Sequence, residues 1–121
     1  MELSENERLM LVKKKEEIFK ITDVLLTGTL NNSEKISKIN EIISILSTIA
    51  GYAKADRDLS NFTRLAIQIT SWLEMEMDAS LLITIFCTAA NSIKFDFTKR
   101  GLIISIPIQI KEAILNKIQL G

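Results

Sequence analysis

The carboxylates that lie close together in the sequence are the first candidates for chemistry. They form two clusters, Asp56 with Asp58, and Glu74 with Glu76 and Asp78. The chain has no histidine, so acid–base catalysis at neutral pH would need a carboxylate with a raised pKa. Both clusters lie at predicted helix boundaries, and side chains two positions apart on a helix diverge by about 200°. We therefore expect these carboxylates to cap helices or to face water.

Cys87 is the single cysteine, and it lies in the most apolar stretch of the chain, 79–93. A reactive cysteine needs an electropositive, partly exposed setting, so we expect Cys87 to be a small core residue. The segment 56–58 lacks the glycine and the distal glutamate of a calcium loop. The sequence also has no nucleophile-elbow serine and no glycine-rich phosphate loop. We expect no enzyme activity, no cofactor and no metal site.

The basic residues raise a different possibility, nucleic-acid binding. Lys99 and Arg100 fall at the tip of a predicted hairpin that follows helices, the order found in a winged helix. The helix before that hairpin, 79–91, carries no basic residue with which to contact DNA. Lys13–Lys15 is followed at once by two glutamates, which is typical of a solvated helix face. A transcriptional regulator that uses Lys99 and Arg100 is therefore the alternative function.

Three helices must come first along the chain. Ser4 with Glu7, and Asn31 with Glu34, have the spacing of capping boxes, so helices are predicted over 5–27 and from 31 to about Gly51. The second helix carries apolar residues over a broad face, which requires two neighbours. A third helix is predicted from about 58–60 to Leu73, followed by the cluster of acidic residues.

After the third helix, the pattern of apolar and polar residues changes twice. The stretch 79–91 is apolar on all sides, which favours a helix in the middle of a bundle or at an oligomer interface, with a buried strand as the alternative. Apolar residues alternate with polar ones over 93–98 and 102–106, which predicts a β-hairpin. Pro107 suits the first turn of a last helix that ends near Gln119, with Ser105 as a possible cap.

These elements predict one fold class. The 121 residues fit a single helix-rich domain over 1–121, of class α+β and mainly α, with about five helices packed as a bundle and one β-hairpin before the C-terminal helix. Twenty isoleucines and fifteen leucines against seven aromatic residues mean that branched aliphatic side chains must fill the core. The acidic N-terminus lacks the layout of a signal peptide, and the first helix has a polar face of mixed charge. We expect a cytoplasmic protein without membrane association.

The remaining function class is protein–protein interaction. The wide apolar helix faces and the isoleucine-rich edge 102–106 predict a homodimer, with a monomer that buries all of these faces as the alternative. The zero net charge does not oppose self-association. We expect a non-enzymatic regulator, adaptor, inhibitor or assembly chaperone. The composition suggests an AT-rich genome, and small proteins of this kind often come from phages or other mobile elements. The predicted partner-binding residues are Lys94, Asp96, Lys99 and Arg100. The predicted dimer contacts are Trp72, Leu82, Phe86 and Ile103.

Overall fold

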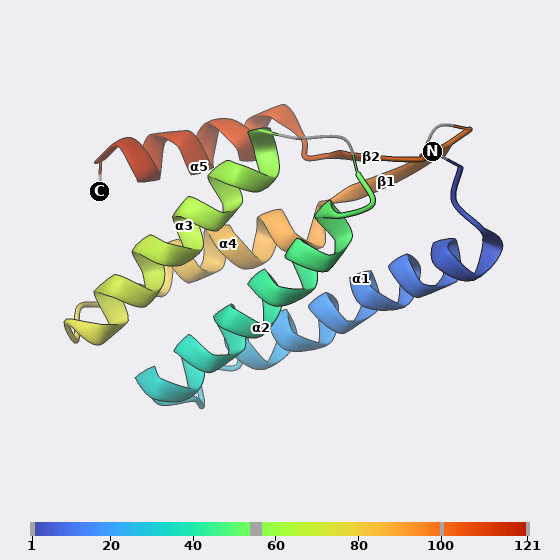
Figure 1. Ribbon diagram of the computed structural model, residues 1–121. Coiled ribbons are helices and arrows are strands. Elements are labelled where there is room, and N and C mark those ends of the chain that lie inside the picture. Colours follow the sequence, from blue (N-terminus) through green and yellow to red (C-terminus); the bar gives the residue numbers. More distant parts are fainter. Residues whose placement is uncertain (1, 54–56, 100, 121) are drawn as a thin grey trace.

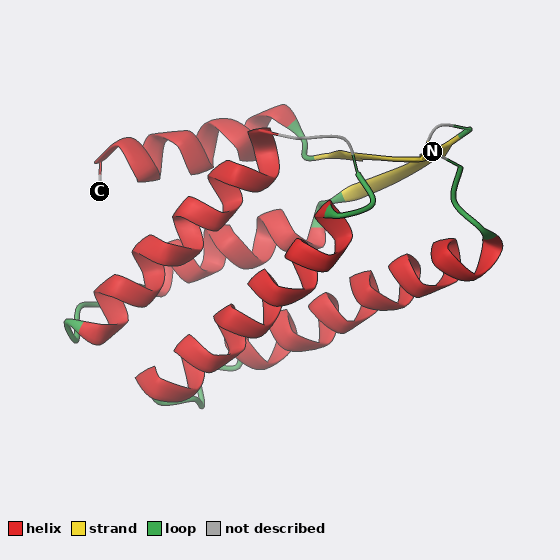
Figure 2. Ribbon diagram, in the orientation of Figure 1, coloured by secondary structure: helices red, strands yellow, loops and turns green. Residues whose placement is uncertain are grey.

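The computed structural model describes residues 2–53, 57–99 and 101–120, and its elements follow the predicted order. The helices and strands are α1 (Glu5–Leu26), α2 (Asn32–Ala50), α3 (Arg57–Glu74), α4 (Ser80–Asn91), β1 (Lys94–Thr98), β2 (Gly101–Ser105) and α5 (Ile108–Leu120). The α+β class, mainly α, with a hairpin before the last helix, is thereby confirmed (Figure 2).

The first two helices begin where their capping signals predict. The Ser4 and Asn31 side chains accept hydrogen bonds from the backbone N–H groups of Glu7 and Glu34, at 3.1 and 2.8 Å. Each glutamate carboxylate accepts the N–H of the capping residue in return. Beyond α1, Gly28 has a φ of +73°, a conformation that favours glycine and ends the helix.

The helices form a closed arrangement around one core. α4 packs against α1, α3 and α5, while α2 packs against α1 and α3 (Figure 1). The core is mainly leucine and isoleucine, and Phe62 of α3 stacks on Phe86 of α4 with ring centroids 4.5 Å apart. Thr22 is the buried polar residue of the described core, and its hydroxyl lies 2.8 Å from the Phe19 carbonyl and 3.0 Å from Oδ1 of Asn91. This contact joins α1 to the end of α4.

The residues 80–91 form a helix, and the alternative of a buried strand is excluded. One side of α4 faces the core with six buried residues, and the other side faces solvent. Three of its outward residues, Ser80, Thr84 and Thr88, bear only a hydroxyl, and Leu81 is apolar although exposed, which hid the amphipathic pattern in the sequence. Within the described chain, none of the helices combines the length and hydropathy needed to cross a bilayer.

The hairpin leaves the bundle beside the start of α1 (Figure 1). Its strands are antiparallel, with Phe95 opposite Ile104 and Asp96 opposite Ile103. Each strand starts one residue away from the predicted position, and Gly101 supplies a φ of +128° as β2 begins. Ala53 forms an isolated parallel bridge with Leu102, so the end of β2 nearest the turn is not a free edge.

The last helix starts directly after Pro107. The Pro107 carbonyl accepts hydrogen bonds from the N–H groups of Ile110 and Lys111. Pro107 therefore occupies the capping position that was predicted for Ser105. Ser105 is instead the last residue of β2. Gln68 of α3 donates to the carbonyl of Lys117, which ties α3 to α5.

Candidate interaction surfaces

Three of the four predicted partner-binding residues lie on the exposed part of the hairpin. Lys94 and Asp96 point outward from β1, opposite Ser105 and Ile103 of β2. We call these four residues the outer hairpin face; Ile103, predicted as a dimer contact, is 47% exposed within it. Lys99 is exposed in the turn, and the predicted residue Arg100 lies outside the described residues. The outer hairpin face therefore carries an apolar side chain together with side chains of both charges.

The other side of the hairpin is held by α1 through two cation–π contacts. The Arg8 guanidinium lies 5.6 Å from the centroid of the Phe97 ring, and Nζ of Lys15 lies 5.1 Å from that of Phe95. Such contacts stabilise by about 0.5–1 kcal/mol each at partly exposed sites. Sequence reasoning missed them, because the cations are separated from their rings by 89 positions (97 − 8) and 80 positions (95 − 15). They fix the direction in which the outer hairpin face points.

The other predicted dimer contacts do not lie together. Leu82 and Phe86 are 3% and 0% exposed, and their own chain covers them, so in this structure they are not on a surface that a second copy could contact. Trp72 is half-buried near the end of α3, at the opposite end of the bundle from the hairpin and Ile103 (Figure 1). The sequence signal of an apolar helix did not distinguish the inward side of α4 from its outward side.

The outward side of α4 carries hydroxyl groups at every fourth position. We call Ser80, Thr84, Thr88 and Ser92 the hydroxyl row. Thr84, Thr88 and Ser92 each donate to the carbonyl four residues earlier, at 3.0, 2.8 and 2.7 Å. The Ser80 hydroxyl donates to the Asp78 carboxylate at 2.6 Å. Every donor in the row is therefore satisfied within the chain, and the row carries no charge.

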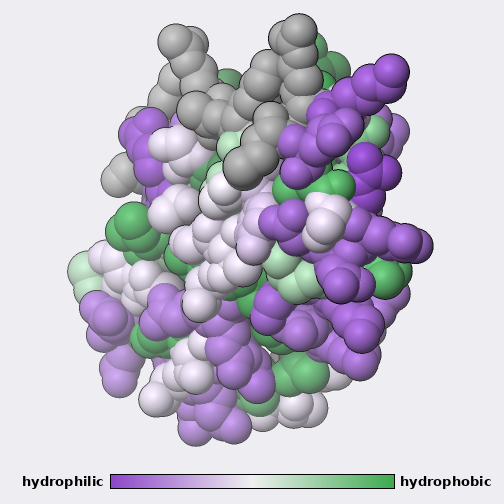
Figure 3. Space-filling model, turned by 45° about the vertical axis from the view of Figure 1, so that its right-hand side comes forward, coloured by the Kyte–Doolittle hydropathy of each residue, from purple (hydrophilic) through white to green (hydrophobic). Residues whose placement is uncertain are grey.

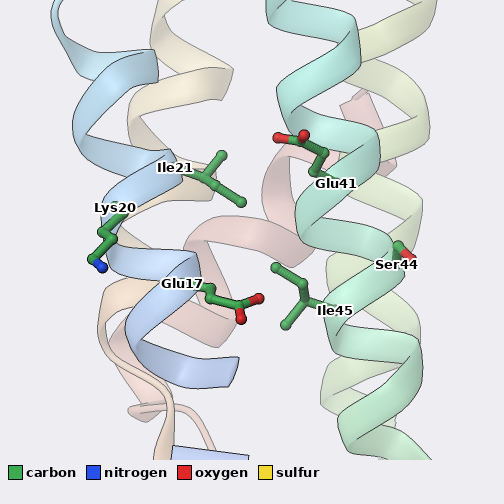
Figure 4. Close-up of a pocket in the computed structure, with 6 residues that line it drawn as sticks. All are labelled: Glu17, Lys20, Ile21, Glu41, Ser44 and Ile45. Atoms are coloured by element: carbon green, nitrogen blue, oxygen red, sulfur yellow. The ribbon is translucent and has the colours of Figure 1, made fainter. Parts of the chain in front are cut away.

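A groove of about 440 Å³ lies between α1 and α2. Ile21 and Ile45 point toward one another across it, with Glu17 beside them, while Lys20 and Ser44 point outward (Figure 4). The groove is thus apolar in the middle and polar at its rim.

The two carboxylates of this groove are paired within their own helices. Glu17 lies 3.6 Å from Nζ of Lys14, and Glu41 lies 3.3 Å from Nζ of Lys38. Each partner side chain is at least one third exposed, so water screens these pairs. The arrangement does not bring two free carboxylates together for catalysis.

The residues singled out for chemistry lie in different parts of the fold, the acidic residues at the end of α3 and Cys87 on the buried side of α4. Glu74, Glu76 and Asp78 are exposed at the turn after α3, where hydrogen bonds from the hydroxyl and N–H of Ser80 lower the pKa of Asp78. Asp56 lies outside the described residues, and no cluster of three potential metal ligands occurs among the residues that the structure describes. Burial raises the pKa of the Cys87 thiol to about 12, so at neutral pH it is protonated and unreactive.

The visible surface is mixed in character. On the face shown in Figure 3, hydrophobic residues form small separate patches among hydrophilic ones. Function must therefore be argued from particular residues rather than from one broad apolar area.

Comparison of the chain with protein-family models, with curated proteins and with solved structures gave no match.

Proposed function

We propose that the protein is a cytoplasmic, non-enzymatic interaction module that presents the outer hairpin face to a partner protein. The observation that supports this most strongly is the register of the hairpin, which gathers Lys94, Asp96 and Ile103 on one outward surface. A half-exposed apolar residue flanked by opposite charges provides both contact area and orientation. A small regulator, adaptor, inhibitor or assembly chaperone would use such a surface.

The bracing of the hairpin also supports binding. Arg8 and Lys15 hold the inner aromatic rings, so the outer residues are ordered before a partner arrives. A pre-ordered surface loses less conformational entropy on binding, which improves affinity for the same contacts. The nucleic-acid alternative has weaker support, because the hydroxyl row of the preceding helix carries no cation.

Site-specific photo-crosslinking in the cells of origin tests the proposal. Benzoylphenylalanine at Ile103 should give a discrete cross-linked product, which Asp96→Lys in the same chain should abolish. The matched control places the photo-crosslinker at Ile67 on α3, an isoleucine that is 62% exposed against 47% for Ile103. Products that are the same from both positions, or none from position 103, would contradict a partner surface on the hairpin.

The proposed module is a homodimer that pairs along the hydroxyl row of α4. Small side chains at every fourth position let a second helix approach closely, and i±4 rows are those that interlock in the commonest helix crossings. Because the row's hydroxyls already have acceptors, covering them with a second copy leaves no donor unsatisfied. The absence of charge removes repulsion between the two copies.

Light scattering on a sizing column measures this directly. The wild-type chain should have about twice the 13.6 kDa mass of one copy. Thr88→Lys should give single copies, because it places like charges face to face. Thr48→Lys is the control, since Thr48 is an exposed, back-bonded threonine on α2 and should leave the dimer intact. A wild-type mass of 13.6 kDa would contradict the dimer.

A further inference from the structure

The turn between α3 and α4 exposes three large apolar side chains within one short stretch. Met75, Met77 and Leu81 are 58%, 45% and 61% exposed. We call residues 74–81 the methionine turn. Methionine is flexible and polarisable, so methionine-rich surfaces adapt to the shape of an apolar partner. Three such side chains together are more than the isolated apolar residues that are normal on a protein surface.

The backbone of the methionine turn is fixed by its own hydrogen bonds. The N–H of Met77 donates to the Trp72 carbonyl at 2.9 Å, and the N–H of Glu76 donates to the Leu73 carbonyl at 3.1 Å. This is the Schellman pattern, and Glu76 occupies its left-handed position with a φ of +58°. The turn therefore places Met75 and Met77 on either side of a carboxylate.

The charge on the methionine turn has one sign. Glu74, Glu76 and Asp78 are exposed, and the segment 71–81 contains no lysine or arginine. Glu74 and Glu76 form no ion pair with the described residues. Asp78 accepts hydrogen bonds from the N–H and the hydroxyl of Ser80, and the charge of Lys35 on α2 also lowers its pKa. Apolar side chains alternating with unpaired carboxylates complement a ligand that is apolar and basic.

We propose that the methionine turn docks a basic amphipathic helix of a partner protein. The apolar side of that helix contacts Met75, Met77 and Leu81, and its lysines or arginines face Glu74 and Glu76. An amphipathic helix presents both kinds of side chain at the required spacing. This surface lies at the other end of the bundle from the outer hairpin face, so the inference stands whether or not the hairpin binds a partner (Figure 1).

The probe is a synthetic helical peptide of about 18 residues, with leucines on one side and lysines on the other. Trp72 is the chain's single tryptophan, half-buried directly before the turn, and its emission reports binding to the full-length protein. We expect a saturable change in Trp72 emission, with affinity that falls as salt concentration rises. Peptides with glutamate in place of lysine, or serine in place of leucine, should bind at least about tenfold more weakly.

Paired variants locate the site. Met75→Ser with Met77→Ser should weaken binding about tenfold or more. Glu74→Gln with Glu76→Gln should reduce both affinity and salt dependence. The apolar control is Leu9→Ser with Val12→Ser on α1, and the charge control is Glu16→Gln with Glu112→Gln; all four positions are exposed. Both controls should bind as the wild type does.

Several results would overturn the inference. One is no change in Trp72 emission when the basic peptide is added. Another is that the glutamate peptide binds as tightly as the lysine peptide. A third is that the control variants lose as much affinity for the basic peptide as the methionine variant does. Loss of self-association in the methionine variant would show that a second copy covers the turn instead. Circular dichroism verifies that each variant is folded, and the peptide series gives an answer with the wild-type chain alone.

Discussion

Glu76 is the one non-glycine residue in the described chain with a positive φ. A side chain in that region costs about 1–2 kcal/mol, and glycine recovers part of this after its greater freedom in the unfolded chain is subtracted. Glu76→Gly should therefore stabilise the fold by about 0.5–1 kcal/mol, measured by urea unfolding.

The control for this variant is Glu74→Gly, at the last helical position of α3. There glycine weakens the helix and should destabilise by about 0.5–1 kcal/mol. If both variants destabilise equally, the left-handed conformation at position 76 costs nothing.

Cys87 gives a second prediction for a single residue. Its thiol pKa is raised from 9.0 to about 12 by burial, so the folded state holds the proton more tightly than the unfolded state does. The contribution of Cys87 to stability should be constant below pH 9.0 and should fall as the pH rises from 9.0 toward 12. Cys87→Ala, although less stable overall, should lack this part of the loss of stability at alkaline pH.

Reactivity checks the same feature independently. At pH 8 a thiol reagent should modify Cys87 only at the rate of unfolding, and immediately in denaturant. Fast modification of the folded chain would contradict the burial of this residue.

At the scale of elements, the hairpin depends on α1 for its orientation. Lys15→Met keeps a long unbranched side chain and a similar helix propensity at this position, but it removes the charge over Phe95. We expect amide exchange in β1 and β2 to accelerate about two- to fivefold, equivalent to about 0.5–1 kcal/mol.

Lys13→Met is the matched control, because Lys13 is exposed on the same helix. It should leave hairpin exchange unchanged. Equal acceleration in both variants would show that charge on α1, and not the contact with the ring, is responsible.

The element boundaries were largely predictable where the signal is local. The capping boxes at Ser4 and Asn31, the glycine after α1 and the alternation in the hairpin all depend on neighbours within four residues. The third helix began slightly before the predicted start, and proline rather than Ser105 caps α5.

The surfaces were predictable only in part. Alternation placed Lys94, Asp96 and Ile103 on one side of the hairpin, and the structure agrees. The burial of Leu82 and Phe86 depends on how α1, α3 and α5 surround α4, which no local pattern contains. The cation–π contacts and the groove between α1 and α2 likewise exist only after distant segments have packed.

At the scale of the whole molecule, all five helices share one core, so the described chain should unfold as one unit. Trp72 emission reports α3, and circular dichroism at 222 nm, roughly the helix minimum, reports all helices. The two curves should coincide.

Phe62→Ala should lower the free energy of unfolding by about 3–5 kcal/mol in both curves, because it removes the ring that stacks on Phe86. Separate transitions would show that the helices form two independent units. Val24→Ala, at an exposed position of α1, is the control and should change stability by less than about 0.5 kcal/mol.

The contacts between α1 and the hairpin have a consequence during synthesis. Phe97 is added 89 residues (97 − 8) after its cation partner Arg8. At ordinary rates of translation this interval is roughly 5–20 s. During most of it, until α4 is added, the side of α1 that will pack on α4 and the hairpin has no partner within its own nascent chain. A ribosome-associated chaperone would meet this exposed helix side in that interval.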